Sequence, residues 1–556
     1  MADLADDVSG PDGMSVSPSE PAIRDQLARI LASPQFAASD GARRLLRFVV
    51  EETLAGRADT LKEYTLATEV LGRDASFDPK LSPAVRVEAG RLRQRLERYY
   101  LTLGRDDPVL IELPRGGYVP RFESSSDVLH LRDHLAEVTR ELDASAGDFA
   151  PTLPGGPAIA VLPFENLSGE GDQPFGNGIS IEILTALSRF HEFRLLGRGT
   201  VFGYRGERDV AQLRANLGAD YVLSGSIRRD AERVRVHAEL VSTADRQVLW
   251  VERFDRELSA GTMFAVEDEI ATRVVTTIAP PHGVISRPGV AIAQRKAPER
   301  LHSYDCLMLF YDYTAHRSPE RHGAVRTVVD AETREAPDVA SLWAALSMLH
   351  IDTWRFGFNV APSREAARAQ GMEAARRAVD LDPRDALGYH ARFLAHFANG
   401  DVKAFRDAGS RALELNPYNT DILADFGLHL TMCDEWSRGL FLLKLALSLN
   451  PEPPDWYWFP FFTWHFDRGE FDDALDMALR SQSPDFYWTH GMHLLAYSAL
   501  GMEDEAAEAL ARLLEIYPDF LREARRELAL WLGPERIERL VVPLRRAGLP
   551  IARAAS

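Results

Sequence analysis

The chain has 556 residues, of which 46% are hydrophobic, and it carries a formal net charge of −19. This length predicts two to four domains, and the acidic balance excludes a protein that is coated along its whole length by nucleic acid. The two cysteines are too few for a disulfide framework or a zinc site, and no stretch approaches the roughly 20 apolar residues of a membrane span. We therefore expect a reducing, cytoplasmic setting without a signal peptide in the acidic start MADLADDVSG.

Residues 1–20 are polar and rich in Ser, Asp, Gly and Pro, which predicts a disordered tail. The first domain is expected over residues 21–123. It begins with two amphipathic helices, at 23–32 and 41–54, that are expected to support the element that follows. This domain holds 17 Lys and Arg against 15 Asp and Glu, so the acidic excess of the chain lies elsewhere.

The most informative stretch covers residues 81–122. Ser82 and Pro83 predict the start of a helix. Apolar residues then recur at helical spacing, at Val85, Ala89, Leu92, Leu96 and Tyr99. The opposite face and its flanks can read a DNA major groove, because arginine pairs with guanine and glutamine with adenine. The candidate DNA-binding residues of this helix are Arg86, Val87, Arg91, Arg93, Gln94, Arg95 and Arg98.

A hairpin is predicted after this helix, with a strand at 109–113, a turn at 114–117 and a returning strand at 118–120. Arg115 at its tip is a further candidate, because an arginine there can reach a phosphate or the minor groove. The alternative is an arginine-rich helix face that is only solvated.

The run VRVEAGRLRQRL, followed by a hairpin that ends in RGGY, resembles the recognition helix and wing of OmpR/PhoB-type winged-helix DNA-binding domains. YTLATEVLG at 64–72 resembles the preceding positioning helix of that family. The resemblance covers about the first quarter of the chain and implies that Val87, Arg91 and Gln94 face the groove, with Arg115 at the wing tip. Two features depart from the family: helical patterns replace its opening antiparallel sheet, and the wing tip is slightly shorter.

Residues 124–156 predict a linker, because they are polar at the front and end in the breaker cluster PTLPGG. A second domain is expected over 157–285, with strands at 158–163, 194–197, 221–228, 233–240 and 247–254 and helices at 179–189, 210–217 and 263–278. Alternating strands and helices followed by a meander predict an open α/β sheet. AIAVLPFENLSGEGDQ, LGADYVLSGSIRR and RVRVHAELV within it resemble the amino-terminal α/β domain of TolB-like proteins.

Bacterial chains with such a unit are often labelled adenylate cyclases, because some relatives carry a class III cyclase domain. That chemistry needs two carboxylates that hold two metal ions. Here the first strand is followed by Glu165 and Asn166, and no second strand-tip aspartate is evident. The sequence also has no GxxxxGK[ST] loop and no HExxH motif. We therefore expect no enzymatic activity, no cofactor and no bound metal.

The last part of the chain repeats. Prolines recur about every 34 residues, at Pro383, Pro417, Pro451, Pro484 and Pro518. Such a period, with alanines at close helix crossings and proline after the second helix, is the signature of tetratricopeptide repeats. We expect an all-α repeat solenoid over 299–550, with extra residues at 354–363 and capping helices near the end. Its concave groove suits an extended or helical peptide.

An unusually aromatic block, DWYWFPFFTWHF, occupies residues 455–466. Trp456, Trp458 and Trp464 are therefore candidate residues for partner binding. The alternative is that this block is the first helix of one repeat and packs its rings on neighbouring helices.

The sequence thus predicts a multidomain chain with a winged helix-turn-helix (α+β) head, an open α/β sheet domain and a tetratricopeptide repeat solenoid. The predicted function is that of a transcriptional regulator. It would bind double-stranded DNA and sense or recruit a protein or peptide partner through its other two domains, without a membrane. One alternative is an interaction scaffold that does not bind DNA, and the third hypothesis is a nucleotide cyclase-related enzyme. The DNA target, the effector, the partner and the oligomeric state are left open.

Overall fold

The computed structural model describes most of the chain. Its described residues are 18–33, 36, 40–70, 107, 109–113, 118–124, 153–168, 173–203, 210–230, 233–257, 263–450 and 452–529, with helical positions 85, 89, 92, 95, 96, 99, 537, 538 and 541. The chain forms two compact units, Met1–Ala136 and Glu137–Ser556. It is mostly helical, with one mixed sheet in the second unit.

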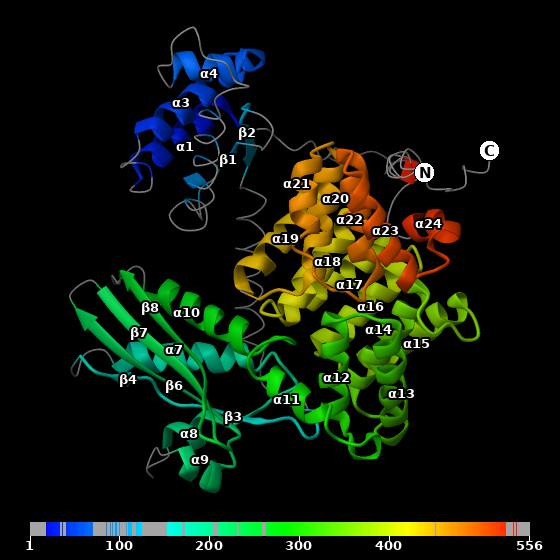
Figure 1. Ribbon diagram of the computed structural model, residues 1–556. Helices are drawn as coiled ribbons and strands as arrows, with labels where there is room; N and C mark the ends of the chain where they lie inside the picture. The colour runs from blue at the N-terminus through cyan, green and yellow to red at the C-terminus, as the bar shows by residue number, and fades with distance from the viewer. Residues whose placement is uncertain are drawn as a thin grey trace, which may run out of the picture. The chain divides into compact units, whose positions relative to one another are not determined.

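The first unit is a small helical domain with one hairpin (Figure 1). Its elements are α1 (Glu20–Ala32), α3 (Asp40–Leu54), η1 (Ala58–Thr60), α4 (Glu63–Glu69), β1 (Val109–Glu112) and β2 (Arg121–Ser124). Leu45, Leu46 and Val49 of α3 are fully buried, because apolar residues three and four apart form one face of a helix. Within residues 18–70, the described part has helices and no strand, as the sequence patterns predict.

The returning strand of the hairpin was predicted too early. β1 and β2 are antiparallel, and their pairing closes at Glu112 opposite Arg121. The return therefore begins at Arg121 and not at Tyr118. Pro120 accounts for the difference, because proline has no N–H to give to a strand ladder.

The second unit opens with a six-stranded sheet in the order β5-β3-β6-β7-β8, and β4 pairs with β6 off this path. The strands are β3 (Ala158–Val161), β4 (Glu165–Asn166), β5 (Arg194–Leu195), β6 (Tyr221–Asp230), β7 (Arg233–Ser242) and β8 (Val248–Glu257). The helices are α7 (Gln173–Leu187), α8 (Arg198–Gly203), α9 (Val210–Leu217), α10 (Met263–Ile278) and α11 (Ser286–Ala293). β3 runs parallel to β5 and β6, whereas β6, β7 and β8 are antiparallel, so the sheet is mixed.

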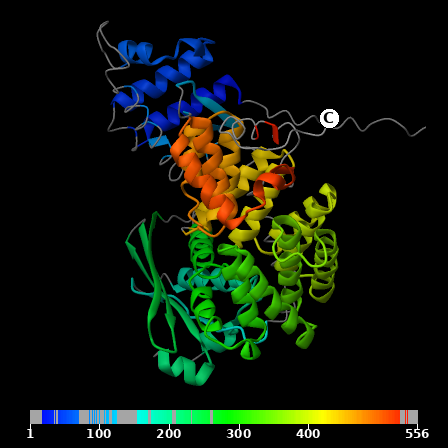
Figure 2. The same ribbon diagram turned by 45° about the vertical axis from the view of Figure 1, so that its right-hand side comes forward.

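The two faces of this sheet are covered by different helices (Figures 1 and 2). Ile159 and Val161 of β3 face the main core with α7 and α10, whereas Ala160 faces a smaller cluster with α8 and α9. This follows from the alternation of side chains along a strand. α7 begins six residues before its predicted start, and its first turn lies close to the sheet: a Cβ at Gly176 would lie 2.8 Å from the Phe164 carbonyl oxygen.

The rest of the unit is a stack of antiparallel helix pairs, drawn from green to red in Figure 2. The elements are η2 (Pro298–Arg300), α12 (Ser303–Ala315), α13 (Pro319–Glu335), α14 (Ala340–Phe356), α15 (Arg364–Leu381), α16 (Ala386–Ala398), α17 (Val402–Leu415), α18 (Thr420–Met432), α19 (Trp436–Leu449), η3 (Asp455–Trp458), α20 (Phe459–Asp467), α21 (Phe471–Ala478), α22 (Tyr487–Leu500), α23 (Glu503–Ile516) and α24 (Phe520–Ala529). Second helices end two residues before Pro337, Pro383, Pro417, Pro451 and Pro518. The tail therefore has tetratricopeptide-like pairing.

The extra residues, predicted at 354–363, fall only in part in the loop between α14 and α15; the others lengthen both helices, which have 17 and 18 residues against 13 and 14 in α16 and α17. The loop 357–363 has seven residues, whereas 399–401 between α16 and α17 has three. Gly357 begins it in the left-handed region, at φ 72°, which favours glycine. None of the described helices is long and apolar enough to cross a membrane.

The sheet and the repeats of the second unit share a polar interface. His191 Nδ1 lies 3.2 Å from Asp382 Oδ2, beyond the end of α15. Tyr311 Oη of α12 donates to Glu192 Oε1 at 2.5 Å. Burial raises the pKa of Glu192, and this effect exceeds the lowering by the tyrosine hydrogen bond. Burial lowers the pKa of His191, but Asp382 and nearby acidic residues raise it by more.

Candidate functional site

The helical positions between 85 and 99 contribute an apolar stripe to the core of the head. The buried residues are Val85, Ala89, Leu92, Leu96 and Tyr99, as the spacing predicts. Tyr99 Oη donates to Asp107 Oδ2 at 2.6 Å, and the same carboxylate accepts from Gln26 Nε2 of α1 at 2.5 Å. Through Asp107, these hydrogen bonds connect Tyr99, on the buried side of the 85–99 segment, to Gln26 of α1.

Most of the candidate DNA-binding residues lie outside the described residues. This holds for Arg86, Val87, Arg91, Arg93, Gln94, Arg98 and Arg115. Arg95 is described, and it is half-buried. The assignment of a groove-reading face therefore stays a prediction.

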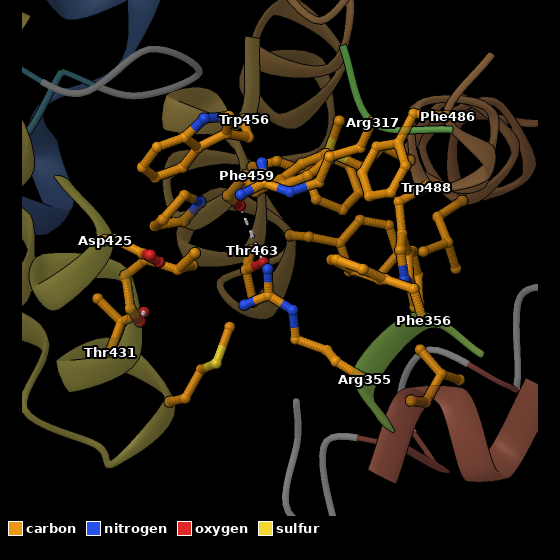
Figure 3. A pocket seen from close by; sticks show the side chains of 18 of the residues that line it. Arg317, Arg355, Phe356, Asp425, Thr431, Trp456, Phe459, Thr463, Phe486 and Trp488 are labelled. Carbon is orange, nitrogen blue, oxygen red and sulfur yellow. Dashed lines mark hydrogen bonds between the residues drawn. The ribbon is translucent and has the colours of Figure 1, made fainter. Parts of the chain in front are cut away.

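A pocket of about 110 Å³ lies among the helix pairs of the tail, and Figure 3 shows its side chains. The first helices of several pairs form its walls, namely α14, α18, α20 and α22, together with α24. Its aromatic residues are Phe356, Trp436, Trp456, Phe459, Phe462, Phe466, Phe486 and Trp488. Its polar residues are Arg317, Arg355, Asp425, Thr431 and Thr463.

The three tryptophans predicted for partner binding have different places. Trp456 lines the pocket and is 8% exposed, and its indole N–H is buried without a hydrogen-bond acceptor among the described residues. Trp458 and Trp464 are absent from the pocket lining. The Arg480 guanidinium lies 4.6 Å from the Trp458 ring, and Trp464 packs on Trp436 at a centroid distance of 5.3 Å.

The charged residues of the pocket wall were not predicted from the sequence. Asp352, behind the wall, lies between two guanidinium groups, 3.4 Å from Arg317 Nε and 3.0 Å from Arg355 Nη2. All three side chains are at most 10% exposed. The one available signal was local: charged residues interrupt the otherwise apolar α14 sequence, LWAALSMLHIDTWRF.

Asp425 forms the second part of the polar wall. Its Oδ2 lies 2.9 Å from His390 Nε2, and its Oδ1 lies 3.2 Å from His429 Nδ1. Burial raises the pKa of Asp425, but the two imidazoles outweigh burial and hold that pKa well below its usual range. The Arg355 Nη1 atom lies 3.4 Å from His429 Nε2, so the two parts of the polar wall are connected.

Contacts between early and late helices narrow the space around this pocket. The rings of Phe356 and Phe486 meet edge to face with centroids 5.3 Å apart. Arg364 Nη2 lies 3.1 Å from Glu527 Oε1 of α24, whose side chain is fully buried. At this level of the stack, the second helix pair therefore contacts the last helices beside the pocket.

One group of possible metal ligands occurs among the described residues. His465, Glu470 and Asp473 each offer an atom within 4.8 Å of the others. His465 Nδ1 already contacts Glu470 Oε2 at 2.8 Å, and the two acidic residues lie at the start of α21. Acidic side chains are favourable at a helix N-terminus without any metal.

Comparisons with known proteins concern parts of the chain. The family described as HilA/YgeH-like transcriptional regulator, second domain, matches residues 156–273. A Rhizobium meliloti (strain 1021) protein named "Putative adenylate cyclase 3" is 30% identical over 262 residues. That match covers 46% of this chain and 43% of that protein, so the chain spans less than half the length of this relative.

Solved structures show weaker similarity. TolB from Acinetobacter baumannii is 19% identical, with 23% of this chain and 30% of that chain covered and a TM-score of 0.18. YrrB, described as a TPR protein with an unusual peptide-binding site, is 19% identical, with 34% and 93% covered and a TM-score of 0.23. Over its mixed sheet and the helices that pack on it, this chain is thus similar to the second domain of HilA/YgeH-like transcriptional regulators.

Proposed function

We propose that this chain is a cytoplasmic transcriptional regulator whose head binds double-stranded DNA as a winged helix. Its TolB-like α/β domain and its repeats would sense or recruit a protein partner. The observation that carries the proposal is the match of residues 156–273 to a domain of transcriptional regulators. That match begins after the predicted linker that follows the segment whose sequence resembles a recognition helix and wing.

The head supports this proposal by its packing. The positions of the 85–99 segment that are described and apolar all face the core. Because a helix turns by about 100° per residue, the intervening Arg91 and Gln94 belong on the other side, where a groove can be read. Residues 21–123 have nearly equal numbers of basic and acidic side chains, whereas the rest of the chain is acidic. This distribution favours one DNA-binding domain beside other domains that repel non-specific DNA.

The proposal assigns no catalytic step to the chain. The name of the Rhizobium relative raises nucleotide cyclisation as a second candidate. Glu165, the carboxylate that follows the first strand of the sheet, is exposed on β4. Purified protein with ATP and Mg²⁺ or Mn²⁺ is expected to form no cyclic nucleotide above a blank. Turnover that is lost in Glu165→Ala would favour the enzyme instead.

The DNA proposal is tested with the full-length protein by fluorescence anisotropy. On a duplex selected from random fragments, Arg91→Ala and Gln94→Ala are each expected to cost about 1–3 kcal/mol and to relax sequence preference. Arg24→Gln is the matched control, because Arg24 lies on α1 and pairs with Glu20 and Glu51. Equal losses on random and selected DNA would mean that Arg91 and Gln94 contact phosphates only.

The salt dependence separates a regulator from a scaffold. If half or more of the candidate arginines contact phosphates, the logarithm of affinity falls with the logarithm of salt concentration with a slope of roughly −3 to −5. A slope near zero would favour the alternative, an interaction scaffold whose arginine face is only solvated.

A further inference from the structure

The side chains that line the pocket in the repeats have no role in the proposed function. Aromatic rings and methionine form most of its wall, and Arg317 and Arg355 supply its cationic groups (Figure 3). The Arg317 guanidinium also lies 5.7 Å from the centre of the Trp456 ring. A mostly apolar cavity with a few convergent polar groups is the usual form of a small-ligand site.

The size of the pocket limits the ligand. Its volume of about 110 Å³ is of the same order as that of an apolar cavity of about 150 Å³ that holds benzene. The Phe356–Phe486 contact and the Arg364–Glu527 ion pair join early and late helices beside it. A peptide that follows the inside of the stack does not fit this volume, whereas one ring or a short branched chain does.

The charges limit the ligand further. The carboxylates of the cluster are already engaged, Asp352 by two guanidinium groups and Asp425 by two imidazoles. Arg317, Arg355 and Asp425 line the pocket, whereas Asp352 lies behind its wall, so the lining itself carries two positive groups and one negative group. A ligand carboxylate beside the guanidinium groups would balance the excess, and arginine holds carboxylates through paired hydrogen bonds. A cationic ligand would find both carboxylates occupied.

We propose that this pocket binds a small apolar carboxylic acid, no larger than a single ring. Its carboxylate pairs with Arg317 and Arg355, and its apolar part lies among the rings of Trp456, Phe459 and Trp488. This ligand is additional to DNA and to a protein partner, and its binding requires neither.

The test uses the full-length protein and benzoate, with tryptophan fluorescence as the readout because Trp436, Trp456 and Trp488 line the pocket. Benzoate is expected to give a saturable change. Benzamide has nearly the same shape without the charge and is expected to bind at least roughly tenfold more weakly, which equals about 1.4 kcal/mol. Benzylamine, a cation of similar size, is expected to give no saturable change.

Arg317→Gln is expected to remove the preference for benzoate over benzamide. Arg321→Gln is the matched control, because Arg321 lies on α13, pairs with Asp312 and does not line the pocket. Thr463→Phe tests the same site without removing a buried charge: the half-buried Thr463 lines the pocket, and a ring there is expected to abolish binding of both ligands.

The proposal is overturned if benzoate gives no saturable change, or if benzamide binds as tightly as benzoate. It is also overturned if Thr463→Phe leaves benzoate affinity unchanged. If a short peptide with a C-terminal phenylalanine binds more tightly than benzoate, the ligand of the pocket is a peptide C-terminus and the proposal of a small acid is wrong. DNA affinity is measured separately, so failure of this proposal leaves the test of the regulator intact.

Discussion

Replacing Glu267 by glutamine is expected to stabilise the α/β domain at alkaline pH and not at acidic pH. Glu267 lies on α10, is 6% exposed and packs on α7, where a Cβ at Gly178 would lie 2.4 Å from its Oε1. Burial, followed by the negative charges of Glu182 and Asp268, raises the pKa of Glu267 to about 7. The carboxyl is therefore protonated in the folded protein at mildly acidic pH and must ionise in a buried place at higher pH.

The sign and size of the effect follow from this pKa. A group whose folded pKa is raised contributes stability that is complete below its unfolded pKa, near 4.5, and is lost as the pH rises through about 7. At about 1.36 kcal/mol per pKa unit, a rise from 4.5 to about 7 sets a ceiling of about 3 kcal/mol. Because water can enter beside a surface helix, we expect about 1–3 kcal/mol.

The assay compares melting of the full-length wild type and Glu267→Gln from about pH 5 to about pH 8.5. The variant is expected to melt at nearly the same temperature as wild type at the acidic end and higher at the alkaline end. Glu269→Gln is the matched control on the same helix, because it removes an ion pair of 2.6 Å with Arg256. That control is expected to lose up to about 1 kcal/mol. An effect of Glu267→Gln that is equal at both ends would refute the reasoning.

Three further substitutions test packing and charge in the second unit. Gly409→Ala is expected to cost about 1–3 kcal/mol of unfolding free energy, because the new Cβ would lie 2.2 Å from the Phe426 ring; thermal melting measures it. Arg364→Ala is expected to cost about 1–3 kcal/mol, because it removes one of two cations from the fully buried Glu527, which keeps Arg526; denaturant unfolding measures it. His191→Gln is expected to lower the melting temperature more near pH 6 than near pH 9. Its folded pKa is raised, so the contribution is complete below about 6.5 and is lost as the pH rises through the folded value.

The first two of these substitutions have a control variant in the repeats. Gly388→Ala should stabilise α16 by up to about 1 kcal/mol, because its Cβ would meet the nearest atom at 3.5 Å. Arg512→Ala, in an exposed pair with Glu515, should cost at most about 1 kcal/mol. Equal effects of a test variant and its control, or a His191→Gln effect that does not vary with pH, would contradict these expectations.

The sequence by itself determined the local elements of this protein. The alternation of Val234, Val236, Ala238 and Leu240 predicted β7, and these side chains are all buried. The proline period near 34 residues predicted the ends of four second helices, two residues before Pro383, Pro417, Pro451 and Pro518, whereas α21 ends six residues before Pro484. These signals are readable because helical and strand periods, and a repeat that contacts its neighbours, depend on residues close in sequence.

The tertiary structure alone decided where the sheet is mixed and where the pocket lies. β4 and α8 are too short for a periodic signal, and the predicted helix at 179–189 missed the first turn of α7, where Gly176 lies close to the Phe164 carbonyl. The aromatic block pointed to Trp456 but not to Arg317 or Asp425, which lie about 140 and about 30 residues away along the chain. Their meeting depends on the curvature of the whole stack, which sums many small rotations between helix pairs and leaves no mark at any one position.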